Sequence, residues 1–209
     1  MNKTAQLVLS FAEFEERYPN ASVEDFARHL LARGRPVKAA AAGVKGHSIL
    51  AKLIGRIMRL NSHYANAALR AIDLGGLDEF TYLLSVSMLN NPTKTEVINQ
   101  NFQELSSGLL IISRLKSKGL LSEKPDTEDK RSRRIMLTKK GQLKLAAAQV
   151  ELSRVSHLFF GSIGDDDIQL CVSMLSPVEQ EFAGRWALDK GKSFDEIVGG
   201  KKKAGKARD

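Results

Sequence analysis

The stretch "EKPDTEDKRSRRIMLT", residues 123–138, contains four acids and five bases. Short apolar runs lie before it, at 120–121, and near its end, at 135–137, and both have a β-type composition. Charged turn residues and Pro125 separate the two runs, a pattern that is typical of a β-hairpin. The sequence therefore predicts two short strands joined by a strongly charged loop, for which a solvated turn is the simplest explanation.

The positive charge of the chain is concentrated in this hairpin and at the C-terminus. The 209 residues hold 32 Lys+Arg against 24 Asp+Glu, a net charge of +8. Residues 124–140 contain seven bases and three acids, and residues 199–209 contain five bases and one acid, so these two segments hold the whole excess. Such a footprint indicates a polyanionic partner, either nucleic acid or an anionic membrane surface. The membrane ranks low, because the lysine tail carries no aromatic or apolar anchor.

The remaining composition is that of a globular protein. At 43% hydrophobic residues the chain can bury the core of one domain with an appended module. No run of 18 apolar residues occurs, so no membrane span is expected, and the N-terminus meets acids too early for a signal peptide. The single cysteine, Cys171, excludes an internal disulfide framework and suits a reducing cytoplasm. Its apolar helical context predicts a buried, inert thiol, with a redox sensor as the less common alternative.

Helical patterns fill the first third of the chain. Residues 11–33 predict two short helices, with Ser22 as the N-cap of the second and Asp25 near a capping-box position. After a connector at 34–46, a strongly periodic helix runs on to about Leu74, spans about 40 Å, and needs a longer partner than one small domain supplies. We expect it to dimerise, with burial in a core as the alternative. The dimerisation stripe consists of Ile49, Leu50, Leu53, Ile54, Ile57 and Met58.

Three shorter helices precede the hairpin. A helix over 77–89 ends at Pro92, and Thr93 with Glu96 forms a capping box for the next one. A third helix, over 104–118, stops at Gly119. Helical spacing predicts that the inward positions are Leu77, Phe80, Leu83, Leu84, Ser87 and Met88 on the first helix and Leu105, Leu109, Ile112 and Leu115 on the third.

Further helices follow the hairpin. Thr138 caps a long helix that continues to Phe160, and residues 161–164 interrupt it. Three aspartates at 165–167 suit the positive N-terminal end of the next helix. The segment 176–179, "SPVE", has the composition of one more helix start.

The order of helix, short helix, helix and two-stranded hairpin is that of a winged helix-turn-helix. Residues 77–145 resemble the DNA-binding lobe of the MarR family of bacterial transcriptional regulators. "TKTEV" at 93–97 resembles the start of the family's first helix-turn-helix helix, and "SRLKSKGLL" at 113–121 matches the end of its recognition helix. "DTEDKRSRRIMLTKKG" at 126–141 is the most specific piece, because it matches the family's wing signature. That signature is carried by Asp126, Asp129, Arg131, Leu137, Thr138 and Gly141.

We therefore expect a mainly α fold with a small β-hairpin wing, in which a winged helix-turn-helix DNA-binding lobe is joined to a helical dimerisation domain. The expected divisions are an N-terminal helical extension (1–43), a long dimerisation helix (44–76), the DNA-binding lobe (77–145), C-terminal dimerisation helices (146–190) and a disordered basic tail (191–209).

Physical arguments for DNA accompany the resemblance. The first residues of a recognition helix reach base edges in the major groove, and hydroxyls at a preceding helix start suit phosphates. Wing arginines suit narrow minor grooves, and Arg134, which alternates with Ile135, should face solvent or phosphate. The resemblance implies that the wing acids Asp126 and Asp129 orient arginines. The predicted DNA-binding residues are Thr93, Thr95, Ser106, Ser107, Gly108, Arg114, Lys130, Arg131, Arg133 and Arg134.

An enzyme is the weaker interpretation. The four histidines, at 29, 47, 63 and 157, have no cysteine or carboxylate at a catalytic or zinc spacing, so we expect no catalytic residues, cofactor or metal. The resemblance implies a homodimer on pseudo-palindromic double-stranded DNA, with a small-molecule effector. His63 and Tyr64 are candidates for an effector pocket, with a helix surface as the commoner alternative. The second hypothesis is a winged-helix module that binds protein or RNA through a non-specific basic wing.

Overall fold

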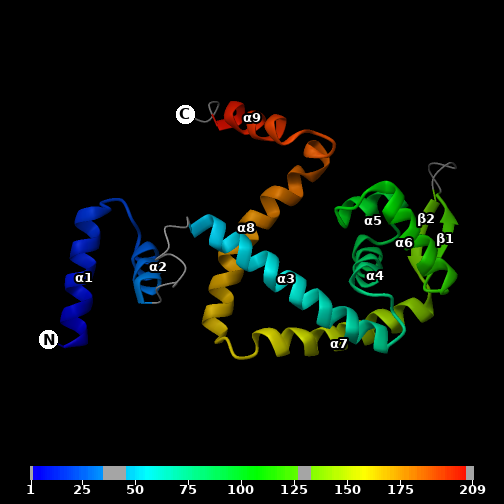
Figure 1. The fold of residues 1–209 in the computed structure, drawn as a ribbon, viewed down its shortest axis with the longest axis horizontal. Helices are drawn as coiled ribbons and strands as arrows, with labels where there is room; N and C mark the ends of the chain where they lie inside the picture. Colours follow the sequence, from blue (N-terminus) through cyan, green and yellow to red (C-terminus); the bar gives the residue numbers. More distant parts are fainter. Residues whose placement is uncertain (1, 35–45, 127–132, 206–209) are drawn as a thin grey trace. The chain divides into compact units, whose positions relative to one another are not determined.

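The computed structural model describes residues 2–34, 46–126 and 133–205. The chain divides into two compact units, Met1–Met58 and Arg59–Asp209, and each is described by itself. Across the described residues, no helix combines the length and the apolar character that crossing a membrane requires. The mainly helical fold with one two-stranded antiparallel hairpin that the sequence predicts is confirmed (Figure 1).

The N-terminal unit contains a pair of helices, α1 (Lys3–Arg17) and α2 (Val23–Gly34). Their contact is aromatic: the ring of Phe14 lies 5.4 Å from that of Phe26, and both side chains are buried. The start of α2 is the predicted cap, since the N–H of Ser22 donates to Asp25 over 2.9 Å and the Ser22 hydroxyl accepts from the N–H of Asp25. This reciprocal arrangement satisfies two N–H groups at a helix end.

Helix α3 (Gly46–Ala71) is the long periodic helix, and its end is built into the second unit. Leu69 is fully buried, and the N–H of Leu74 returns to its carbonyl over 3.0 Å. The side-chain amide oxygen of Asn66 accepts the N–H of Leu77 over 2.8 Å. Gly76 has a φ of 143°, and a Cβ there would lie 2.6 Å from the same amide oxygen. A glycine is therefore required at the junction between α3 and α4.

The lobe that follows has the predicted winged helix-turn-helix order (Figure 1). The two strands pair antiparallel, with Leu121 opposite Leu137 and Lys124 opposite Arg134. One cluster of buried side chains from α4, α5, α6, both strands and α7 holds the lobe together. The elements are α4 (Leu77–Leu89), α5 (Lys94–Gln100), α6 (Leu105–Ser117), β1 (Leu121–Pro125), β2 (Arg133–Leu137) and α7 (Lys139–Phe160).

The buried face of α4 differs from the prediction. Met88 is 71% exposed and Ser87 is also exposed, whereas Tyr82 and Val86 are buried. The reason is that α4 contacts α5, α6, α7 and β2 together. These elements cover a wide face centred on Tyr82 and Val86 instead of the narrower face that the apolar spacing predicts. The burial of its ring raises the pKa of Tyr82 to about 12. Of the predicted inward residues, Leu83 is buried, and Leu77, Phe80 and Leu84 pack against the core.

The C-terminal helices correct two further predictions. Helix α8 (Asp165–Asp189) begins at the three aspartates as expected, but it continues through Pro177 instead of restarting there. The Ser176 hydroxyl bonds back to the carbonyl of Val172 over 2.8 Å, and a proline removes only one backbone hydrogen bond from an otherwise continuous helix. Cys171 is exposed rather than buried, because no residue of α8 is buried in this chain.

The basic tail is partly helical. Helix α9 (Phe194–Gly205) occupies most of the segment for which we predicted disorder. Its start is a capping box that the sequence contains as "SFDE": the N–H of Ser193 donates to Glu196 over 2.8 Å, and the Ser193 hydroxyl accepts from the N–H of Glu196. The hydroxyl and the N–H of Ser193, which both donate to the Glu196 carboxylate, lower the pKa of Glu196. The lysine-rich composition concealed this helix start in the sequence.

Gly141 provides the sharpest packing test. A Cβ at this position in α7 would lie 2.1 Å from the backbone oxygen of Leu120, and a backbone atom cannot turn aside. Gly141→Ala should therefore destabilise the lobe by about 2 kcal/mol or more, as overpacking does. The control is Gly184→Ala, because a Cβ at Gly184 in α8 meets nothing within 4 Å. It should stabilise the chain by up to about 1 kcal/mol. Urea unfolding of both variants measures the difference, and equal midpoints would contradict the packing argument.

Candidate nucleic-acid interface

Helix α6 presents two small hydroxyls at its first turn. Ser106 and Ser107 are both exposed, and Glu104 precedes them as an N-cap residue without a side-chain cap bond. The turn before α6 is fixed by Asn101, whose side-chain N–H₂ donates to the Ser85 hydroxyl and to the carbonyl of Val97. The first turn of α6 is therefore both accessible and anchored.

The inner face of α6 is shifted from the predicted one. Leu105 is 53% exposed and Leu109 is 40% exposed, whereas Ile112 and Leu115 are buried as expected. Four apolar residues in a row, at 109–112, leave the periodicity ambiguous. Gly108 also belongs to the buried face of α6, and the prediction left it out.

Gly108 is predicted in the sequence as a point of close approach to DNA, and the structure corrects this. It is buried, and a Cβ there would lie 2.4 Å from Ile98 and 2.6 Å from the Tyr82 hydroxyl oxygen. The absent side chain lets α6 pack closely on α4 and α5. The buried Tyr82 hydroxyl has no hydrogen-bond partner among the described residues.

The start of α5 is the predicted capping box. The N–H of Thr93 donates to a Glu96 carboxylate oxygen over 2.6 Å, and its hydroxyl accepts from the N–H of Glu96 over 3.2 Å and donates to that same carboxylate oxygen over 2.9 Å. The hydrogen bonds from Thr93, with the nearby Arg134, lower the pKa of Glu96 below 4.5. The Thr93 hydroxyl thus serves the cap, while Thr95, two residues further on, is exposed.

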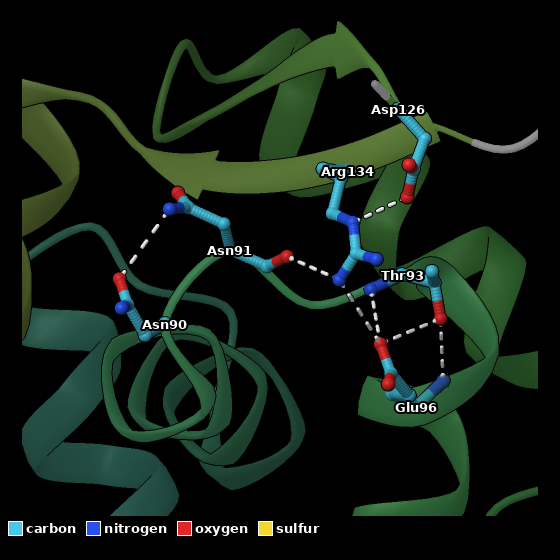
Figure 2. A network of polar contacts seen from close by, with 6 residues as sticks. All are labelled: Asn90, Asn91, Thr93, Glu96, Asp126 and Arg134. Atoms are coloured by element: carbon cyan, nitrogen blue, oxygen red, sulfur yellow. Dashed lines mark hydrogen bonds and ion pairs between the residues drawn. The ribbon is translucent and has the colours of Figure 1, made fainter. Parts of the chain in front are cut away.

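Arg134 anchors the wing to the start of α5 (Figure 2). Its Nε donates to the carboxylate of Asp126, whose side chain is only 4% exposed. Its Nη1 donates to the carbonyl of Asn91 over 3.2 Å and lies 4.0 Å from Glu96. The sequence predicts that Arg134 faces solvent or phosphate, but its guanidinium turns back to Asp126 and Asn91, and the side chain is 38% exposed. Asp126 does orient an arginine, and that arginine is Arg134.

A third strand-like segment, which we missed in the sequence, supports the wing. The N–H of Ile135 donates to the carbonyl of Pro92 over 2.8 Å, and Thr93 forms an isolated β-bridge with Arg134. Proline has no N–H to donate to a neighbouring strand, so the sequence at Pro92 predicts only the end of a helix. Strand β2 is therefore bonded on both edges, to β1 and to the chain that enters α5.

The loop of the wing lies outside the described residues. This loop, 127–132, contains the predicted DNA-binding residues Lys130 and Arg131 and the predicted wing-orienting residue Asp129. Their roles remain predictions. At the near end of β2, Arg133 is exposed, with its side chain 62% accessible. Arg133 is therefore a described wing cation that is accessible to a partner.

Glu123 collects cations from three elements and was missed in the sequence. One of its carboxylate oxygens lies 2.9 Å from Nζ of Lys94 in α5 and 2.7 Å from Nζ of Lys116 in α6. The other lies 3.8 Å from Arg133 in β2. Burial alone would raise the pKa of Glu123, but the hydrogen bonds from the two lysines outweigh it and lower the pKa. Strand alternation was the available signal, since it puts Glu123 on the same face as the buried Leu121.

Arg114 is exposed two turns along α6 from Ser107, about 10 Å at the helical rise. It borders a hollow of about 270 Å³ at the junction of α3, α4 and α6, together with Ser62, Asn66 and residues 75–79. Buried Glu79 lies at its edge, where it accepts the N–H of Gly75 over 2.7 Å and pairs with Lys118 over 2.9 Å. His63 and Tyr64 do not border this hollow and are exposed on α3, which is the helix-surface alternative.

The end of α8 contacts the turn that leads into α6. The ring of Trp186 packs edge-on against Phe102 at 5.8 Å. Nζ of Lys190 donates to the carbonyl of Gln103 over 3.2 Å and lies 3.3 Å from the carboxylate of Glu104. Phe102 has a φ of 52°, which a residue with a side chain rarely adopts. The turn before α6 is thus held by Asn101, which bonds to α4 and α5, and by the end of α8.

Taken together, these elements define a winged helix-turn-helix protein. The fold is that of the MarR-family transcriptional regulators. The structure matches a mutant of MarR from E. coli complexed with operator DNA, at a TM-score of 0.57 and 21% identity over 62% of this chain and 92% of that one. It matches AbsC, a MarR-family regulator from Streptomyces coelicolor, at 0.60 and 15% identity over 68% and 97%.

A third solved structure is similar to the same extent. An organohalide-sensing transcriptional regulator bound to 2,4-dichlorophenol matches at a TM-score of 0.60 and 19% identity, over 71% of this chain and 87% of that one. The sequence matches no protein-family model and no curated protein. The likeness is therefore one of fold.

The Arg134 anchor can be tested by removing its buried partner. Asp126→Ala should lower the free energy of unfolding by about 1.5–3 kcal/mol, the scale of a hydrogen bond to a charged group. It should also speed amide exchange in β2. Glu151→Ala serves as the control, because its partner Arg154 is 73% exposed and such surface pairs contribute about 0.5 kcal/mol or less. Equal losses in both variants, by urea unfolding, would show that the anchor adds nothing.

Proposed function

We propose that this chain is a sequence-specific DNA-binding transcriptional regulator. The observation that carries the proposal is the exposed first turn of α6, with Ser106 and Ser107, beside a capped helix start and a basic hairpin. A helix enters the major groove of DNA, and its first residues reach base edges there. The operator DNA bound to the MarR mutant of similar fold supports the same use of the fold here. A bacterial regulator of this kind works in the cytoplasm, where the chromosome lies.

The division of labour follows from position. Ser106 and Ser107 would contact base edges, since they stand at the start of α6. Thr95 and the backbone at the start of α5 would contact phosphate, helped by the positive end of the helix dipole. Arg133, with the loop cations Lys130 and Arg131, would contact the flanking backbone or minor groove.

The regulator would act as a homodimer. Along the first half of α3, Leu50, Leu53, Ile54 and Met58 are 42% to 62% exposed in the single chain. Helix α8 has no buried residue in 25, although it carries Val172, Met174 and Phe182. Exposed apolar side chains of this density in a long helix favour a partner, and a second copy would place two recognition helices on a pseudo-palindromic site.

A small-molecule effector would use the hollow beside Arg114. A ligand there would contact α3, α4 and α6 at once, with a guanidinium and several backbone groups available to it. Binding that favours one arrangement of these helices would shift the spacing of the recognition helices in the dimer. The 2,4-dichlorophenol bound to the regulator of similar fold supports control of this chain by a small molecule.

The direct experiment is selection from a pool of random-sequence duplexes at moderate salt with competitor DNA. We expect enrichment of a pseudo-palindrome whose half-sites lie about one helical turn apart. Binding without any enriched sequence, or preference for RNA, would replace the proposal with that of a non-specific basic module.

Two substitutions should separate base reading from phosphate contact. Ser107→Ala should change the enriched base pattern and leave the slope of log K against log salt unaltered, because a hydroxyl at a base edge releases no counterion. Arg133→Ala should retain the pattern and make that slope shallower by about 0.9 for each wing, or about 1.8 for the dimer. Fluorescence anisotropy over a salt series measures both, and the reverse assignment would sink the proposed orientation.

Oligomeric state has its own test. The parent chain should have about twice its 23.0 kDa mass by light scattering. Leu53→Asp should give monomers or aggregates, since it buries an unpaired charge in the proposed interface. Lys52→Asp, an exposed neighbour on the opposite side of α3, is the control and should remain dimeric. A parent mass near 23.0 kDa at micromolar concentration would rule the homodimer out.

A further inference from the structure

Glu123 is the point at which three parts of the proposed DNA-binding surface meet. Lys94 is the first residue of α5, Lys116 lies in the last turn of α6, and Arg133 begins β2. All three direct a cationic group at one carboxylate on β1. The Glu123 side chain is 8% exposed, so this convergence belongs to the interior edge of the lobe rather than to a loose surface pair.

The two lysines share a single carboxylate oxygen, at 2.9 Å and 2.7 Å. Two ammonium groups so close together repel each other, and the carboxylate between them is what makes the arrangement stable. Each ammonium has three N–H donors. The lysine side chains remain 34% and 40% exposed, so further donors are accessible from outside.

We propose that Glu123 is a positioning residue for DNA recognition, which holds Lys94 and Lys116 as a pair of phosphate-binding cations at a fixed place on the lobe. This inference rests on the proposed function. Phosphate contacts carry no sequence information themselves, but they set the register of a protein on the duplex. A fixed cation pair at the meeting point of α5 and α6 sets the register of the α6 hydroxyls on the bases.

The charge of Glu123 makes the inference distinguishable from plain electrostatics. Removing a negative charge from a DNA-binding surface should strengthen binding to every duplex, because attraction to phosphates is independent of sequence. Freeing two positioned lysines should instead strengthen or preserve non-specific binding while it weakens binding to the preferred sequence. The discriminating quantity is therefore the ratio of the two affinities.

The experiment uses the full chain and two probes, the duplex enriched by the parent protein and a random-sequence duplex of equal length. Glu123→Gln removes the charge and keeps the shape, whereas Glu123→Asp keeps the charge and withdraws it by one methylene. Both should lower the affinity ratio by about tenfold, the scale of losing the readout of one base pair. Binding to the random duplex should be unchanged for Glu123→Asp and unchanged or tighter for Glu123→Gln. Glu151→Gln, which removes the same charge from the exposed pair on α7, should keep the parent ratio.

Lys116→Gln supplies a second test that leaves Glu123 in place. It should lower the ratio and also make the salt slope shallower, because a phosphate contact is lost. A general loss of folding would lower both affinities in step and leave the ratio intact.

The inference is overturned if Glu123→Gln tightens both probes equally, if both affinities fall together, or if Lys116→Gln changes neither ratio nor slope. If the parent protein enriches no duplex at all, the proposed function fails and this inference fails with it. A parent that discriminates, with Glu123 variants that discriminate equally well, refutes the inference alone.

Discussion

Strand β2 is the element on which the arrangement of the lobe depends. It pairs with β1 along one edge, and along the other Ile135 bonds to Pro92 and Thr93 bridges to Arg134. Ile135 is fully buried in the common core, and Arg134 reaches both Asp126 and the chain entering α5. The wing is thus continuous with the helix-turn-helix, and a movement of one must carry the other. Precise recognition requires such rigidity, because base contacts tolerate little displacement.

The DNA-binding lobe and the proposed dimerisation helices differ in how their apolar side chains are covered. The lobe closes its own apolar cluster, with buried residues from α3, α4, α5, α6, both strands and α7, and needs no second chain to be compact. Helix α8 and the first half of α3 leave their apolar residues uncovered. The end of α8 nevertheless contacts the helix-turn-helix through Trp186 and Lys190. In the proposed dimer, a second copy would cover the apolar residues of α8, and the end of the same helix contacts the turn before α6. A change in the dimer interface would therefore reach α6 through α8.

Local chemistry made three capped helix starts predictable, whereas it left the buried faces of two helices undetermined. The caps at Ser22, Thr93 and Thr138 were predicted and are present, because a side-chain cap joins residues that lie only three apart in the sequence. The inward faces of α4 and α6 were rotated in the prediction, since continuous apolar runs leave the phase open until the neighbouring elements are known. For the same reason Gly108 was taken for a DNA contact, and the packing of α6 on Tyr82 could not be seen.

Counting charges in the sequence does not show which cations are already engaged within the chain. Seven bases in 124–140 indicated a polyanionic partner, yet Arg134 is committed to Asp126 and Asn91, and Lys140 donates to the carbonyl of Lys118 over 2.8 Å. Conversely, Glu123 in the opening stretch sits among cations that lie far from it in sequence. The two described acids of the hairpin, Glu123 and Asp126, therefore do not oppose its bases: each pairs with cations and fixes where they point. Affinity for a polyanion depends on how many cations are present, but selection of one sequence depends on how firmly each is held.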